Sequence, residues 1–217
     1  MDLFSLSWSA LRAAVDGLPD GDFERQSGCA GWLVRDLVCH LVIDAQDVLI
    51  TLATPAATEP TRNAVTYWEV VEPPTGADPL DALTVRLAAA YQDPGLLRFH
   101  LDDVGSAAGR PAALADPDAR VGTRGQVLTV RDYLGAYVLE WTLHHLDLVA
   151  AVPDAAGPPP EALARSRAML EQIAGFPLPA ALSDTSALLV TTGRRPPTPE
   201  EQPHLAHLTP HLPLPLG

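Results

Sequence analysis

Two long runs without proline constrain this chain more than any other feature, although 22 of its 217 residues are proline. The runs cover Trp32–Leu52 and Thr129–Ala151. In both runs, apolar side chains recur every three or four residues, the spacing that places them on one face of an α-helix. Pro55 and Pro153 follow closely and end the two runs. We therefore expect two long helices, the second capped by the hydroxyl of Thr129.

Three shorter segments also have helical spacing: Leu3–Gly17, Pro79–Gln92 and Glu161–Ile173. The first two, together with the long runs, make four amphipathic helices. Four such helices typically pack as a bundle, with sites built from side chains on facing helices. We expect residues 94–126, which are rich in Gly, Ala, Asp and Pro, to form a long linker.

The composition changes after Pro153. Residues 157–160 read Gly-Pro-Pro-Pro and mark a boundary, and Ala187–Thr192 is predicted as a strand. From Pro196 onward the chain is interrupted by prolines, and we expect it to be loosely structured. The predicted fold is mainly α. It has a four-helix bundle over residues 1–153 and a small C-terminal α/β appendage with a proline-rich tail over residues 154–217.

The net charge is −13, from 14 basic and 27 acidic residues, which argues against nucleic acid or an anionic membrane as a partner. No apolar stretch reaches the ~18 residues that span a bilayer, and the N-terminal segment lacks the pattern of a signal peptide. Cys29 and Cys39 are interpreted as small buried residues in a reducing compartment. We expect a cytoplasmic protein that is either a monomer or a homodimer.

A candidate metal site comes from the two long runs. Glu140 and His144 lie one helical turn apart, on the same face of the second run. His40 lies in the first run, and two imidazoles with one carboxylate can hold a divalent metal while leaving positions open. Asp147, one turn beyond His144, could accept the proton of the ring nitrogen that does not bind metal. The spacing alone also allows an exposed Glu140–His144 pair and an ordinary core histidine at position 40.

Other polar residues are open to two interpretations. Asp44 and Asp47 share a helix face with His40, and each is either solvated, a fourth ligand or an outer acceptor. Arg194 and Arg195 could recognise a carboxylate, but solvation at the surface is the preferred interpretation. Three more histidines have helical spacing but are interrupted by prolines, and we interpret them as tail residues: His204, His207 and His211.

Two segments carry a family resemblance. Cys29–Leu41 reads Cys-Ala-Gly-Trp-Leu-Val-Arg-Asp-Leu-Val-Cys-His-Leu, and Glu140–Asp147 reads Glu-Trp-Thr-Leu-His-His-Leu-Asp. They resemble the Gly-Trp-x-Val-Arg-Asp-Leu-x-x-His-Leu and Glu-x3-His signatures of the mycothiol-dependent maleylpyruvate isomerase family, part of the DinB-like superfamily of four-helix metalloproteins. The Thr-Gly-Arg sequence at residues 192–194 is similar to a segment near the end of those chains. One departure is Ala30, where the family often has proline.

The resemblance implies that His40, Glu140 and His144 are the metal ligands. Zn²⁺ is the preferred ion, with Ni²⁺, Mn²⁺ or Fe²⁺ as alternatives. The resemblance also implies mycothiol as the thiol cosubstrate, held as a thiolate near pH 7 and adding to a small electrophile. An adduct that eliminates the thiol after bond rotation gives an isomerase, and an adduct that is kept gives a transferase.

Three other functions remain open. A non-catalytic, stress-linked metal-binding protein would keep the bundle without turnover. A metal-dependent hydrolase would use the same triad to activate water instead of thiol. A helical interaction module without metal would need all three ligands to be packing or surface residues.

Overall fold

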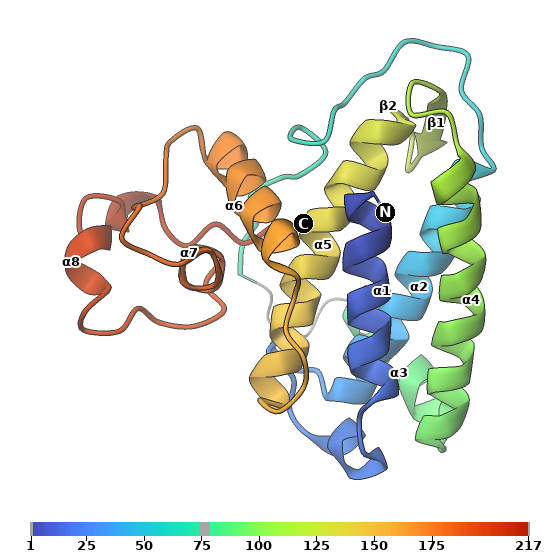
Figure 1. The fold of residues 1–217 in the computed structure, drawn as a ribbon, viewed down its shortest axis with the longest axis horizontal. Coiled ribbons are helices and arrows are strands. Elements are labelled where there is room, and N and C mark those ends of the chain that lie inside the picture. The colour runs from blue at the N-terminus through green and yellow to red at the C-terminus, as the bar shows by residue number, and fades with distance from the viewer. Residues whose placement is uncertain (1, 74–78, 217) are drawn as a thin grey trace.

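Four long helices pack side by side in the larger part of the molecule (Figure 1). They are α1 (Leu3–Asp16), α2 (Val34–Leu52), α4 (Pro94–Leu114) and α5 (Val130–Ala151). In this computed structural model, which describes residues 2–73 and 79–216, α1 and α5 run one way and α2 and α4 run the other. α2 packs mainly against α4, and α1 lies against α4 and α5. The predicted mainly helical fold, a bundle with a small appendage, is confirmed.

One bundle helix, α4, is a segment that we expected to be a linker. The prediction is wrong for residues 94–114, because the glycines and prolines there have helical roles. Pro94 lies in the first turn, and the Asp93 side chain accepts a hydrogen bond from the Gly95 amide at 2.8 Å. The carbonyl oxygen of Gly105 accepts a hydrogen bond from the Trp8 indole nitrogen at 2.9 Å, and a Cβ there would lie 2.7 Å from the Trp8 ring. Packing of α1 on α4 therefore requires this glycine.

The predicted third helix, α3 (Pro79–Tyr91), exists but is not the fourth member of the bundle. It packs mainly against α2, and its Leu83 and Leu87 side chains remain exposed. Its apolar spacing predicts a helix, and the structure confirms it. Its place in the bundle was wrong, since periodicity does not say which helix is the neighbour.

A β-hairpin joins α4 to α5. Its strands are β1 (Arg120–Thr123) and β2 (Gln126–Thr129), antiparallel with Thr123 opposite Gln126. Arg124 and Gly125 form the turn, with φ values of 47° and 76°. Two consecutive positive φ values are the pattern of a type I′ turn, whose twist matches that of the strands. At the end of the hairpin, Thr129 Oγ1 accepts a hydrogen bond from the Asp132 amide at 3.1 Å, as predicted for the cap of α5.

The C-terminal residues form a smaller lobe beside α5 (Figure 1). It contains α6 (Pro160–Ala174), α7 (Asp184–Thr191), α8 (Gln202–Leu205) and the short 3-10 helix η2 (Thr209–His211). The strand predicted at residues 187–192 is wrong, because most of this segment lies in α7, where the Ser183 hydroxyl accepts a hydrogen bond from the Ser186 amide. A short apolar run fits a buried helix as well as a buried strand. The tail is also more ordered than predicted, since Leu205 and Leu208 are buried.

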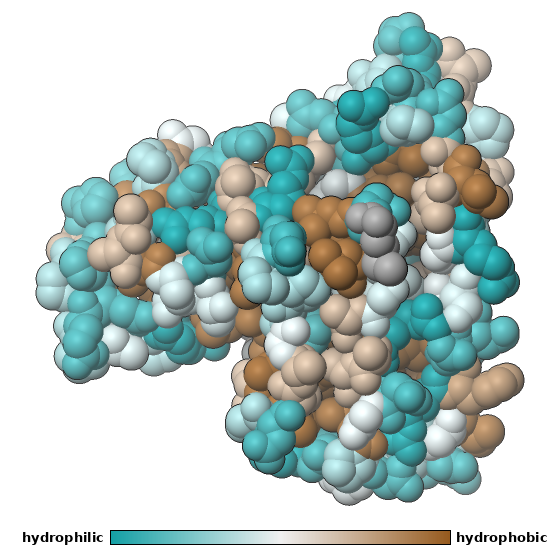
Figure 2. Space-filling view, viewed as in Figure 1, coloured by the Kyte–Doolittle hydropathy of each residue, from teal (hydrophilic) through white to brown (hydrophobic). Residues whose placement is uncertain are grey.

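α5 is shared between two apolar cores. Tyr133 and Trp141 face the core of the four-helix bundle, whereas Leu139 and Leu143 face a second core formed with the C-terminal lobe. A helix that is apolar on all sides belongs in the interior of a protein. Hydrophilic side chains cover much of the lobe's visible outer surface (Figure 2). In the described part of the chain, no helix is long and apolar enough to cross a membrane.

Candidate metal centre

The three side chains predicted as metal ligands meet between α2 and α5. His40 Nε2 lies 3.5 Å from Glu140 Oε1, and His144 Nε2 lies 3.1 Å from the same oxygen. The two imidazole rings are nearly perpendicular, with centroids 4.8 Å apart. One helical turn brings Glu140 and His144 together on α5. His40 joins them because α2 packs on α5.

A further acidic side chain, Asp44, completes a set of four donors. Its Oδ2 lies 3.6 Å from His40 Nε2 and accepts a hydrogen bond from the indole nitrogen of Trp141 at 3.2 Å. Asp44 is only 4% exposed, so its interpretation as a solvated residue is wrong. Burial raises the pKa of Asp44 to about 6, although the charge of His40 opposes the shift. Asp47, one turn further, instead pairs with Arg124, with 2.6 Å between Oδ2 and Nη2.

The spacing of these donors fits a small divalent cation. One ligand atom from each of His40, Asp44, Glu140 and His144 lies within 4.8 Å of the others. Tetrahedral zinc, with bonds of about 2.0–2.1 Å, separates its donor atoms by about 3.4 Å. Three of the separations, 3.1, 3.5 and 3.6 Å, are close to this value. The mixture of imidazole and carboxylate suits zinc and equally nickel, manganese or iron.

The second ring nitrogen of His144 faces Asp147. Its Nδ1 lies 3.2 Å from Asp147 Oδ2, and Asp147 Oδ1 accepts a hydrogen bond from Arg194 Nε at 3.0 Å. Asp147 is 1% exposed, so its charge is compensated inside the protein rather than by water. This arrangement favours a proton on Nδ1 and leaves Nε2 for a cation, which is the usual way in which a carboxylate orients a metal-binding histidine.

Cys29 is a neighbour of this pair that we had interpreted as a packing residue. Its Sγ lies 3.2 Å from Asp147 Oδ2 and 3.7 Å from His144 Nδ1. Burial raises the pKa of the Cys29 thiol, and the charge of Asp147 adds to the effect, so the thiol donates to the carboxylate. The Gly28 amide donates to the Asp147 carbonyl at 2.9 Å, and a Cβ on Gly28 would lie 2.7 Å from Asp147 Cα. Gly28, the glycine immediately before Cys29, is therefore the feature of the sequence that indicates this close contact with Asp147.

The charges of His144 and Glu140 each shift the pKa of the other side chain. Burial lowers the pKa of His144, but the charge of Glu140 and hydrogen bonds to Asp147, Cys29 and Glu140 outweigh it and hold this pKa well above its ordinary value. Burial raises the pKa of Glu140, but the charge and hydrogen bond of His144 and the hydrogen bond of His40 hold it well below its ordinary value. A cation bound between them would replace the proton on His144 Nε2.

A cavity of about 370 Å³ opens onto the donor set, a size that suits a small molecule. Its walls combine metal donors, aromatic rings and a few polar groups: His40, Asp44, Tyr67, Trp68, Glu69, Arg124, Gln126, Tyr137, Glu140 and Leu216. Leu216 reaches the cavity because it pairs with Val70, so the C-terminal lobe contributes to the wall. The site therefore has a place for substrate beside the place for a cation.

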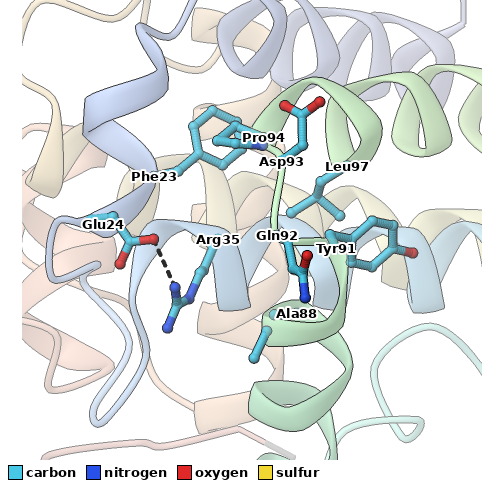
Figure 3. A pocket seen from close by; sticks show the side chains of 10 residues that line it. Phe23, Glu24, Arg35, Ala88, Tyr91, Gln92, Asp93, Pro94 and Leu97 are labelled. Atoms are coloured by element: carbon cyan, nitrogen blue, oxygen red, sulfur yellow. Dashed lines mark hydrogen bonds and ion pairs between the residues drawn. The ribbon is translucent and has the colours of Figure 1, made fainter.

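A second hollow lies at the start of α4, next to the 3-10 helix η1 (Asp20–Glu24) (Figure 3). Phe23, Arg35 and Tyr91 are among its lining residues, and Arg35 Nη1 pairs with Glu24 Oε1 at 2.7 Å. The cavity has a volume of about 30 Å³, which is room for only one or two water molecules. This hollow is too small for a substrate.

The remaining predicted candidates lie apart from the donor set. Arg194 contacts Asp147 as described, and Arg195 pairs with both oxygens of Glu201 at 2.7 Å, so the surface-solvation interpretation is wrong for both arginines. The three tail histidines are exposed, and no donor cluster found among the described residues includes them.

Comparison with known protein families identifies a domain that covers most of this chain. Residues 4–149 match the mycothiol maleylpyruvate isomerase N-terminal domain, which is more than half of the chain. The chain belongs to this family. In this family member the match contains His40, Glu140 and His144, whereas Arg194 and the rest of the C-terminal lobe lie beyond it. Neither a curated protein nor a solved structure matches the chain.

Proposed function

We propose that this protein is a divalent-metal-dependent thiol transferase or isomerase, with mycothiol as cosubstrate and a small electrophile as substrate. The observation that carries the proposal is the convergence of His40, Glu140 and His144, from helices about 100 residues apart in sequence. Two of these side chains, His40 and Glu140, also line the 370 Å³ cavity. Membership of the mycothiol maleylpyruvate isomerase family supports the thiol and the class of reaction.

Each residue has a distinct proposed role. The proposed metal ligands are His40, Glu140 and His144. Asp44, beside them, is either a fourth ligand or a hydrogen-bond acceptor. A bound divalent cation lowers the pKa of a thiol placed on it, which makes the nucleophile available near pH 7. Asp147 fixes the orientation of the His144 ring and is itself held by Arg194.

The test compares His144→Ala with His207→Ala, which removes an exposed histidine outside the cavity. Both proteins are purified without chelator, and metal content is measured by elemental analysis. Turnover is then followed with mycothiol and maleylpyruvate. We expect His144→Ala to lose most of the metal and the thiol-dependent turnover while its circular dichroism is unchanged, and His207→Ala to keep both.

Three results would contradict the proposal. Full metal retention by His144→Ala would show that the cation lies elsewhere. Turnover of hydrolysable esters or amides without any thiol, together with no reaction when mycothiol is present, would identify a hydrolase. Metal binding without any turnover across a panel of electrophiles would favour the non-catalytic alternative.

A further inference from the structure

Arg124 lines the same cavity as the metal donors but comes from a different element, the tip of the β1–β2 hairpin. Its backbone has a φ of 47°, in the left-handed region that Asn and Gly adopt more readily than arginine. A turn of this type is best served by Asn-Gly. An arginine at this position therefore makes the turn less favourable while placing a guanidinium at the cavity wall, which points to a role for the side chain.

The guanidinium of Arg124 already binds a carboxylate. Its Nη2 lies 2.6 Å from Asp47 Oδ2, and the Arg124 side chain is 69% exposed. An arginine has five N–H donors in a planar fork, so one carboxylate oxygen leaves most of them free. Asp47 follows His40 by seven residues on α2, which is about 10 Å along the helix axis. Arg124 and the candidate metal ligands His40 and Glu140 thus line one and the same cavity.

The acidic groups around this cavity have partners of their own. Asp44 accepts from Trp141 and lies beside His40, Glu140 lies between the two imidazoles, and Glu69 Oε1 lies 3.3 Å from Arg62 Nη2. Tyr67 and Tyr137 also line the cavity and add aromatic surface to its wall. The lining therefore combines a guanidinium, aromatic surface and residues of the candidate metal site.

We propose that Arg124 is the specificity residue for the substrate, and that it binds a carboxylate by exchanging Asp47 for the ligand. A ligand that has a carboxylate should then bind more tightly than an uncharged ligand of the same shape. This inference rests on the proposed function, because the bound carboxylate is taken to belong to the substrate of that reaction. The binding step itself needs only the cavity and the hairpin.

The test measures binding of trans-cinnamate and of its uncharged analogue trans-cinnamamide to the zinc-loaded protein by calorimetry. The two ligands have nearly the same shape and differ in charge. A charge-assisted hydrogen bond predicts about a tenfold or larger preference of the wild type for cinnamate. Arg124→Asn should reduce this preference to nearly one while keeping or raising the melting temperature, because asparagine suits the turn. Asp47→Asn, which removes the competing carboxylate, should increase the affinity for cinnamate.

The control is Arg120→Gln, which removes an arginine from the same hairpin that pairs with Glu59 and does not line the cavity. It should keep the preference for cinnamate. An unchanged preference in Arg124→Asn, or none in the wild type, would overturn the inference. The measurement is repeated on metal-free His144→Ala, where a preserved preference supports Arg124 and a lost one shows that the carboxylate had bound the metal instead. The experiment measures binding and not thiol turnover. It therefore tests the role of Arg124 even if the proposed reaction is not found.

Discussion

At the scale of single residues, His144 is held through both of its ring nitrogens. Glu140 lies 3.1 Å from Nε2, and Asp147 lies 3.2 Å from Nδ1. The Arg194 guanidinium and the Cys29 thiol both contact the Asp147 carboxylate, and the Gly28 amide donates to the Asp147 backbone carbonyl. The carboxylate therefore has little freedom to move. A histidine fixed in this way presents one nitrogen to a cation in a defined tautomer.

Asp147→Asn should therefore weaken metal binding although Asp147 is not a proposed ligand. The amide can offer its nitrogen to His144 Nδ1, which favours the wrong tautomer, and it loses the charge that Arg194 needs. We expect a decrease in zinc affinity of about 10–100-fold, the usual effect of changing the partner of a metal-binding histidine. Competition with a chromophoric chelator measures it. Asp154→Asn, at an exposed position, is the control, and equal affinity in the two variants would contradict this role.

The sequence predicted the parts of the site that are local in the chain. Glu140, His144 and Asp147 follow one helix, so their spacing alone places them on adjacent turns. Cys29 and Arg194 could not be predicted in this way, because their contacts with Asp147 span 118 and 47 residues. The position of Arg124 was not predicted either, because it depends on the turn of a β-hairpin within a segment expected to be a linker.

At the scale of elements, α4 shows where periodicity and composition gave the wrong answer. Glycine and proline lower helix propensity, and α4 contains Gly105, Gly109 and Pro111. The two glycines have different surroundings. A Cβ on Gly105 would lie 2.7 Å from the Trp8 ring and 2.9 Å from Arg12 Cδ, whereas a Cβ on Gly109 meets nothing within 4 Å. Tertiary packing, which a single helix segment does not reveal, accounts for the first glycine.

The two glycines provide a matched pair of substitutions with opposite expected signs. Gly105→Ala should lower the free energy of unfolding by about 1–3 kcal/mol through overpacking, because Trp8 is buried and stacked on Trp141 at 3.9 Å. Gly109→Ala should raise it by about 0.5–1 kcal/mol, because alanine is the better helix former and has room. Urea unfolding followed by tryptophan fluorescence measures both. A loss of stability in both variants alike would show that packing on Trp8 is not the cause.

At the scale of the whole molecule, α5 connects the bundle, the donor set and the C-terminal lobe. Its Trp141 packs in the bundle core, its Leu143 packs against the lobe, and its Glu140 and His144 face His40 of α2. Two residues of the C-terminal lobe also lie at the site: Arg194 binds Asp147, and Leu216 lines the cavity. Both lie outside the residues that match the family. A cation held by ligands from α2 and α5 would therefore bind the folded chain and have no equivalent site in the unfolded one.

Metal removal should for this reason lower the melting temperature of the protein. A ligand present at 100 times its dissociation constant stabilises the native state by about 2.7 kcal/mol, which for a chain of this size shifts the midpoint by about 5–10 °C. The shift should shrink as the pH falls, because the pKa of His144 is raised and its proton competes with the cation for Nε2. Differential scanning calorimetry with and without zinc, at pH 8 and pH 6, measures both effects. His144→Ala should show no zinc-dependent shift at either pH, and a shift equal to that of the wild type would place the stabilising cation outside the α2–α5 donor set.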